Sequence, residues 1–97
     1  MATYVALINW TEQGIKNFRD SPKRADAFEQ LVQKHGGRVV GIYWTLGEYD
    51  IVGITEAPDD ETYTAIALEL GSIGTVRTQT LRAFTRNEIE GILAKTG

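Results

Sequence analysis

Five side chains have residue types and positions suited to holding a small molecule: Tyr49, Asp50, Arg82, Trp44 and Phe84. Tyr49 and Asp50 follow a glycine turn, and neighbouring strand residues point to opposite faces, so one can orient a ligand while the other fixes the loop. Arg82 lies late in a threonine-rich strand, where an inward-facing guanidinium suits an anionic or carbonyl ligand. Trp44 and Phe84 would supply apolar walls. We therefore expect a ligand-binding site made of these five residues.

The same residues also have a structural interpretation. A carboxylate after a glycine turn commonly caps backbone N–H groups, and a tyrosine there often closes the end of a core. The polar last strand, with Arg77, Gln79 and Arg82, also fits an edge strand whose polar side chains prevent further pairing. The sequence alone leaves both interpretations open.

Other polar groups are expected to be structural. His35, the only histidine, precedes two glycines at a predicted helix end, where it interacts favourably with the helix dipole. Residues 59–61 are acidic and suit the positive start of a helix. The basic cluster consists of Lys16, Arg19, Lys23 and Arg24. Because it has acidic neighbours, we expect a solvated surface there. No metal-ligand spacing, phosphate loop or catalytic triad is recognisable, so we expect no metal or cofactor and assign no catalytic residue.

Composition narrows the class of protein. The 97 residues carry 10 Lys and Arg against 13 Asp and Glu, a net charge of −3, which offers no overall attraction to nucleic acid or an anionic membrane. The apolar runs are too short to cross a bilayer. We expect a cytoplasmic protein that binds neither nucleic acid nor membrane.

Chain length favours self-association. Residues 1–97 suffice for a single domain, which buries only about 60 to 65% of the surface of its unfolded chain. The chain has no cysteine, so disulfides cannot add stability. Burial against another copy is the remaining common source, and we expect a homodimer or larger homo-oligomer.

The elements that would position these residues follow from periodicity and turn residues. Apolar alternation predicts strands over 2–10, 38–46, 49–56 and 75–84. Apolar residues at helical spacing predict a helix over 22–35, another from 58 to about 71, and a short helix at the C-terminus. The order βαββαβ predicts a ferredoxin-like α+β fold: a four-stranded antiparallel sheet with its helices on one face. The opposite face would stay apolar and uncovered, which again favours a second copy.

The second and third strands are joined only by Gly47 and Glu48. Glycine in the first loop position suits a type II′ turn, for which Gly47 needs a positive φ. This turn would pair Leu46 with Tyr49. One face would then carry Val40, Ile42, Trp44, Leu46, Tyr49 and Ile51.

The residues Gly47-Glu48-Tyr49-Asp50 before a strand resemble the motif of the GYD-domain family, and the likeness extends over about residues 4–86. Residues 11–15, 20–24 and 76–84 are similar to that family as well. The resemblance implies a ferredoxin-like fold that assembles as a dimeric α/β barrel. It implies no activity, because none is established for the family.

Three functions remain open at this level. The first is binding or sensing of a small molecule. The second is a cofactor-independent enzyme of the monooxygenase or isomerase type, which rests on analogy of fold alone. The third is a purely structural or interaction protein. A pocket with a strongly shifted Tyr, Asp or His pKa would favour the enzyme.

Overall fold

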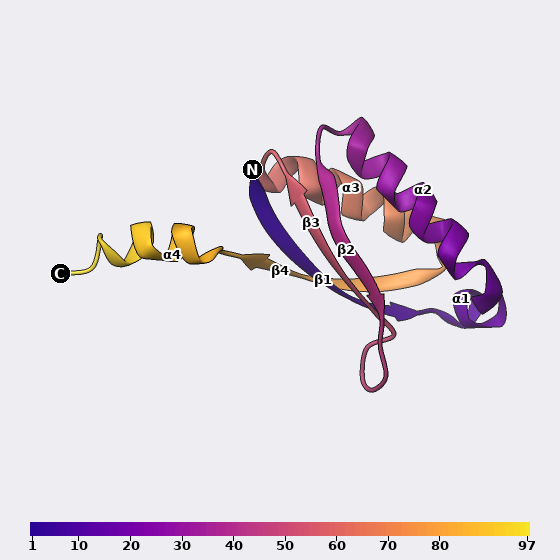
Figure 1. The fold of residues 1–97 in the computed structure, drawn as a ribbon. Helices are drawn as coiled ribbons and strands as arrows, with labels where there is room; N and C mark the ends of the chain where they lie inside the picture. Colours follow the sequence, from indigo (N-terminus) through magenta and orange to yellow (C-terminus); the bar gives the residue numbers. More distant parts are fainter.

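The computed structural model describes all 97 residues and has the predicted α+β architecture (Figure 1). Its strands are β1 (Ala2–Trp10), β2 (Arg38–Trp44), β3 (Ile51–Ala57) and β4 (Val76–Ala83). They form one antiparallel sheet in the order β2-β3-β1-β4. Two long helices, α2 (Ser21–Lys34) and α3 (Asp60–Ile73), lie on one face of it. The ferredoxin-like prediction is therefore confirmed.

The helix ends are defined by capping residues. The short helix α1 (Glu12–Lys16) begins after Thr11, whose hydroxyl accepts a hydrogen bond from Gly14 N. Asp59 caps α3 in the same way, accepting from Thr62 N at 2.8 Å. Helix α3 ends at Gly74, which has a left-handed φ of 88°. None of the helices has the length and apolarity needed to cross a membrane.

Alternate residues of the two central strands form the core beneath the helices. Tyr4, Ala6 and Ile8 of β1 are buried, and so are alternate residues of β3 from Ile51 to Ala57. Helix α2 contributes Val32 and α3 contributes Ile66, both 0% exposed. Every second side chain of the strands thus points toward the apolar faces of the helices, and this contact buries one side of the sheet.

The hairpin between β2 and β3 has the predicted register. Trp44 lies opposite Ile51, and Thr45 N donates to Asp50 O at 2.9 Å. Gly47 has a positive φ of 108°, as predicted. The predicted two-residue turn is wrong, however, because no backbone hydrogen bond joins Leu46 to Tyr49 and the last bond of the hairpin is the one between Thr45 and Asp50. The regular strands end at Trp44 and begin at Ile51, two residues short of the predicted limits on each side.

The prediction that Val40 lies on the same face of the sheet as Ile42 is wrong, because β2 contains a β-bulge at this point. The register shifts between Val39 and Gly41, so Val39 lies opposite Thr55 on the helix side of the sheet. Val40 is 49% exposed and does not share the face of Ile42 as predicted. A bulge inserts one residue on one strand only, which strand alternation cannot reveal without the partner strand.

The opposite face of the sheet has no cover within the chain. It carries the odd-numbered residues of β1 and the side chains paired with them: Val5, Leu7, Tyr43, Val52, Ile54 and Leu81. We call this set the uncovered face. Tyr43 is 56% exposed and Leu81 44% exposed. Large apolar side chains of this kind are rarely left in water over a whole sheet face.

The last helix, α4 (Arg86–Leu93), projects beyond the end of β4 and away from the rest of the chain (Figure 1). Thr85 and Glu88 form a reciprocal capping box at its start. Its apolar residues Ile89, Ile92 and Leu93 share one stripe and are exposed. An isolated helix of this length is marginal in water, so α4 needs a surface to pack against.

Candidate functional site

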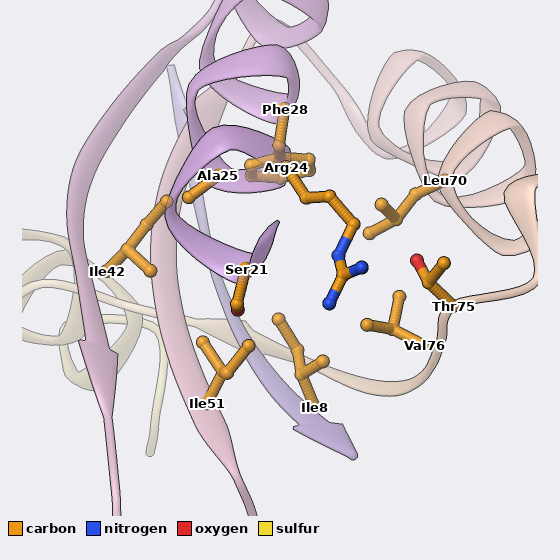
Figure 2. A pocket seen from close by; sticks show the side chains of 10 residues that line it. All are labelled: Ile8, Ser21, Arg24, Ala25, Phe28, Ile42, Ile51, Leu70, Thr75 and Val76. Atoms are coloured by element: carbon orange, nitrogen blue, oxygen red, sulfur yellow. The ribbon is translucent and has the colours of Figure 1, made fainter. Parts of the chain in front are cut away.

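A small cavity lies between the helices and the covered face of the sheet (Figure 2). Its volume is about 60 Å³. The lining consists of Ile8, Ser21, Arg24, Ala25, Phe28, Ile42, Ile51, Leu70, Thr75 and Val76. The strands supply branched aliphatic walls, while α2 and α3 close the cavity from above. The lining is apolar except for one cation and two hydroxyls.

The cavity exists because α2 turns small side chains toward the sheet in its first turns. Ser21 and Ala25 are four residues apart and therefore lie on one face of the helix. Phe28, three residues after Ala25, lies on the same side of the helix and also lines the cavity. The small side chains of Ser21 and Ala25 thus leave space between the start of α2 and the aliphatic strand residues.

Arg24 extends its guanidinium into this space (Figure 2). Its Nη2 donates one long hydrogen bond, of 3.3 Å, to the carbonyl of Gly14. The residue is half-buried, and none of the ion pairs of the chain includes it. A guanidinium has five N–H donors, so most of the donors of Arg24 have no protein acceptor.

Two hydroxyls accompany the guanidinium. Ser21 is 4% exposed, and its Oγ accepts a hydrogen bond from Trp44 Nε1 at 2.9 Å, which leaves its own O–H free to donate. Thr75 is 7% exposed and its hydroxyl makes no hydrogen bond within the chain. Figure 2 shows Ser21 and Thr75 on opposite sides of the Arg24 head group. These three groups are the polar end of an otherwise apolar cavity.

A second hollow of about 80 Å³ adjoins the first between α2 and α3. The two share Arg24, Phe28, Leu70 and Thr75. The second adds Ala27, Leu31 and Ile73 to the lining. Arg24 therefore borders both spaces.

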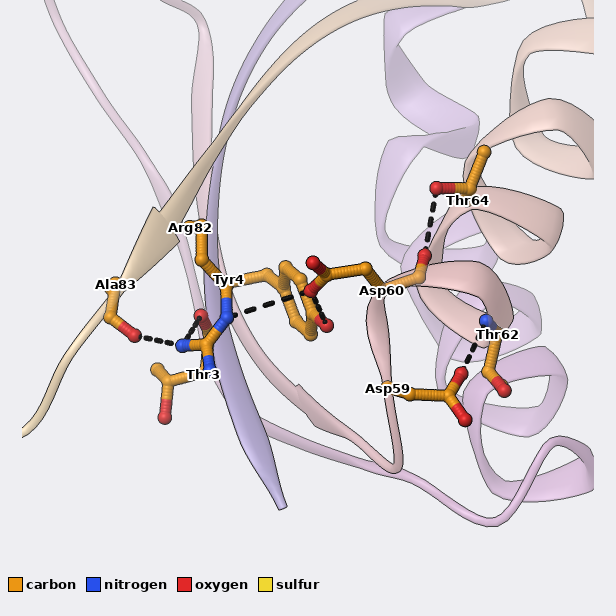
Figure 3. Close-up of polar contacts among 8 residues, drawn as sticks. All are labelled: Thr3, Tyr4, Asp59, Asp60, Thr62, Thr64, Arg82 and Ala83. Carbon is orange, nitrogen blue, oxygen red and sulfur yellow. Dashed lines mark hydrogen bonds and ion pairs between the residues drawn. The ribbon is translucent and has the colours of Figure 1, made fainter. Parts of the chain in front are cut away.

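Arg82 lies in a different polar cluster, near the start of β1 (Figure 3). Its Nε is 3.5 Å from Asp60 Oδ1, at the start of α3. Its Nη1 donates to the carbonyls of Thr3 and Ala83, the first at 3.4 Å. The guanidinium also lies 4.6 Å from the centre of the Phe84 ring. Arg82 is thus already paired with a carboxylate, two carbonyls and an aromatic ring.

Tyr4 is the most strongly shifted group of this second cluster. Burial, followed by its hydrogen bond to Asp60 Oδ1 at 2.6 Å, raises the pKa of Tyr4 to about 12. Its ring stacks on Tyr63 with centroids 4.2 Å apart. The pKa of Tyr63 is raised as well, by burial. Both phenols therefore stay protonated near neutral pH, whereas a general base needs a pKa close to the working pH.

The predicted site residues do not lie together. Asp50 is at the opposite end of β1 from Arg82, and its Oδ2 accepts a hydrogen bond from Trp10 N at 2.9 Å. Tyr49 donates from its hydroxyl to Gln79 Oε1 at 3.2 Å. Gln79 lies opposite Leu7 of the uncovered face, so the prediction that Tyr49 shares the face of Ile51 is wrong. The structure thus brings Arg82 and Phe84 together at one end of the sheet. It places Tyr49 and Asp50 at the other end.

Trp44, predicted as an apolar wall, borders an open hollow with Trp10, Phe18, Arg19, Ser21 and Pro22. Through its hydrogen bond to Ser21 it fixes the start of α2 above the cavity. The indole N–H of Trp10, which borders the same hollow, is buried and has no partner. Trp44 therefore adjoins the cavity but does not line it.

The expectation of a solvated basic cluster is wrong for Arg24. Lys16, Arg19 and Lys23 are exposed as predicted, but Arg24 points inward. Ser21 and Thr75 were not among the predicted residues either. One signal was present: Arg24 is flanked by Ser21, Ala25 and Phe28 on the stripe of α2 that faces the sheet. His35, by contrast, lies at the end of α2 as predicted, with Nε2 3.3 Å from Glu69.

Known proteins resemble this chain in both sequence and structure. The GYD domain family model matches residues 4–93. A Thermus thermophilus protein named "Glutamine synthetase and cystathionine beta-lyase binding protein" is 37% identical over 84 residues, which cover 86% of this chain and 88% of that protein. The solved structure of TTHA0845, also from Thermus thermophilus, superposes with a TM-score of 0.57 at 25% identity, covering 88% of this chain and 95% of that one.

Proposed function

The chain belongs to the GYD-domain family, and on that premise we propose that it is a single-domain, homo-oligomeric, cytoplasmic binding protein that holds a small molecule in the cavity beneath α2. The observation that carries the proposal is the half-buried guanidinium of Arg24, which has no carboxylate partner and lies at the polar end of an apolar cavity. Ligand sites in proteins are mostly apolar cavities with a few convergent polar groups.

Binding fits the cavity better than catalysis does. An acid or base with a pKa near neutrality would support an enzyme of the cofactor-independent type. The largest shift in this chain, that of Tyr4, moves its pKa to about 12, away from neutrality. Tyr4 also lies outside the lining of the cavity. We therefore rank the enzyme behind the binding protein.

The homo-oligomer is supported by two apolar surfaces that the chain leaves without cover. One is the uncovered face of the sheet, and the other is the stripe of Ile89, Ile92 and Leu93 on α4. Every copy carries both surfaces, so a two-fold assembly can bury both at once. A stable interface of ordinary size buries about 1,600 Å² in total.

Sedimentation velocity at low micromolar concentration tests the assembly. We expect a mass that is a multiple of 10.8 kDa. Ile54→Asp, in the middle of the uncovered face, should shift the protein toward monomer, while Lys23→Asp, on the exposed side of α2, should not. A wild-type protein that sediments only at 10.8 kDa would refute the homo-oligomer.

Ligand-observed NMR with a set of small neutral and charged fragments tests occupancy of the cavity. Ala25→Met fills the cavity from α2, and Ala65→Met, at an exposed position of α3, is the matched control. We expect fragments that bind the wild type and Ala65→Met but not Ala25→Met. Binding that Ala25→Met leaves intact, or no binding at all, would overturn the proposal.

A second candidate function is binding to other proteins. It is favoured by the name of the relative, which is described as binding glutamine synthetase and cystathionine beta-lyase. The exposed stripe of α4 offers a surface for such a partner. Co-sedimentation with glutamine synthetase purified from the organism of this chain would support it. The variant Ile92→Asp should weaken this co-sedimentation, and the control Asn87→Asp should not. The absence of co-sedimentation at micromolar concentrations would count against it.

A further inference from the structure

We propose that the molecule held in this cavity is a small, slender aliphatic carboxylate, whose head group pairs with Arg24 while its chain occupies the apolar space beside Ile8 and Ile51. The inference rests on the proposed function, because it names the chemical class of the ligand for the same cavity.

Charge is the first argument. Arg24 is the only charged residue in the lining of the cavity, and its single hydrogen bond goes to the Gly14 carbonyl. A guanidinium in apolar surroundings without a counter-ion is unfavourable, and an anion supplies what the protein does not. Because no carboxylate lines the cavity, nothing there would repel that anion.

The arrangement of donors is the second argument. The fork of N–H groups on a guanidinium matches the two oxygens of a carboxylate. Ser21 and Thr75 lie on either side of the guanidinium in the lining, and each adds a hydroxyl donor to this part of the cavity. Ser21 is also the first residue of α2, whose positive end favours a negative charge. Asp20 and Asp26 are neighbours in the chain, but neither lines the cavity.

Size and polarity restrict the rest of the ligand. At about 60 Å³, the cavity is less than half of the roughly 150 Å³ of an engineered cavity that accepts benzene. The small volume therefore favours a ligand with few atoms beyond its head group, and a second hollow of about 80 Å³ borders some of the same side chains. A bare inorganic anion such as phosphate has no apolar part that could contact the aliphatic walls, so it uses only the polar end of the cavity.

A matched set of probes tests the class of ligand. Pentanoate, 1-pentanol and pentylamine share a five-carbon chain and differ in the charge of the head group, and inorganic phosphate has the charge without the chain. Each would be titrated into the ¹⁵N-labelled full-length protein and followed by amide shifts. We expect pentanoate alone to bind, with the largest shifts at Ser21, Arg24 and Thr75.

Two arginine variants make the test specific. Arg24→Gln keeps a polar side chain without the charge, and should weaken pentanoate binding about tenfold or more, because hydrogen bonds to charged groups are worth more than neutral ones. Arg82→Gln is the control and should leave the affinity unchanged. If Arg24→Gln does not fold, the difference in affinity between pentanoate and 1-pentanol for the wild type serves in its place.

The outcomes separate the two proposals. Equal binding of pentanol and pentanoate, or unchanged affinity in Arg24→Gln, would overturn the carboxylate class and leave a small-molecule cavity in place. Binding of phosphate at Arg24 without binding of pentanoate would overturn it too. If no probe binds and the fragment set also fails, the proposed function itself falls.

Discussion

Two arginines lie on the helix side of the same sheet, and the structure surrounds them very differently. Arg82 meets a carboxylate, two backbone carbonyls and the Phe84 ring. Arg24 meets a single carbonyl and the walls of a cavity. The first has its partners within the chain and serves to tie β4 to the start of α3. The second lacks an anionic partner, and this difference, rather than residue type, is why we propose Arg24 as the binding residue.

The largest expected effect on stability comes from a change at Gly14, whose carbonyl accepts the hydrogen bond of Arg24. A Cβ added at Gly14 would lie 2.0 Å from the Thr75 carbonyl oxygen, so α1 must move away from the end of α3 to accept it. We expect Gly14→Ala to lower the free energy of unfolding by about 2 to 3 kcal/mol, as overpacking does. Urea denaturation measures this.

Gly71→Ala, in α3, is the control for that change. A Cβ at Gly71 meets nothing within 4 Å, and alanine is the better helix former. This variant should be as stable as the wild type or slightly more so. Equal stability of Gly14→Ala and Gly71→Ala would show that α1 does not pack against Thr75 as described.

Removing each arginine charge compares the two clusters directly. Arg82→Gln should cost about 1 kcal/mol of stability, since it removes a partly exposed ion pair and contacts to two aromatic rings. Arg24→Gln should change stability by less than about 0.5 kcal/mol, or raise it, because an unpaired cation is removed. Thermal and urea unfolding of both variants measure the difference. A larger loss for Arg24→Gln than for Arg82→Gln would contradict the comparison.

The smallest effect is confined to alkaline solution and concerns Tyr4. Its pKa is raised from 10.0 to about 12 in the folded chain, so folding favours the protonated phenol. The resulting stabilisation is complete below about pH 10 and is lost as the pH rises through about 12. The stability advantage of the wild type over Tyr4→Phe should therefore shrink across that interval, measured by urea unfolding at a series of pH values.

A difference between wild type and Tyr4→Phe that stays constant across the whole alkaline interval would show that the Tyr4 phenol is not buried against Asp60.

Local chemistry accounts for what the sequence predicted well. Gly47, the alternation of strand residues and the capping Asp59 identified the hairpin register, the buried face and the start of α3. The bulge at Val40 was missed because it is a property of two paired strands.

The two arginines could not be told apart from sequence for the same reason. The partner of Arg82, Asp60, is distant in the chain, and it was interpreted only as part of a helix start. Arg24 has acidic neighbours in sequence that turn out not to pair with it. Which charges remain unpaired depends on tertiary contacts, so the candidate site emerged only from the fold.

A crystal structure of the protein soaked with pentanoate tests the central claim most directly. We predict density for a carboxylate within hydrogen-bonding distance of the Arg24 guanidinium, with the chain running toward Ile8 and Ile51. A cavity without such density, with pentanoate bound instead at Arg82 or elsewhere on the surface, would contradict the claim.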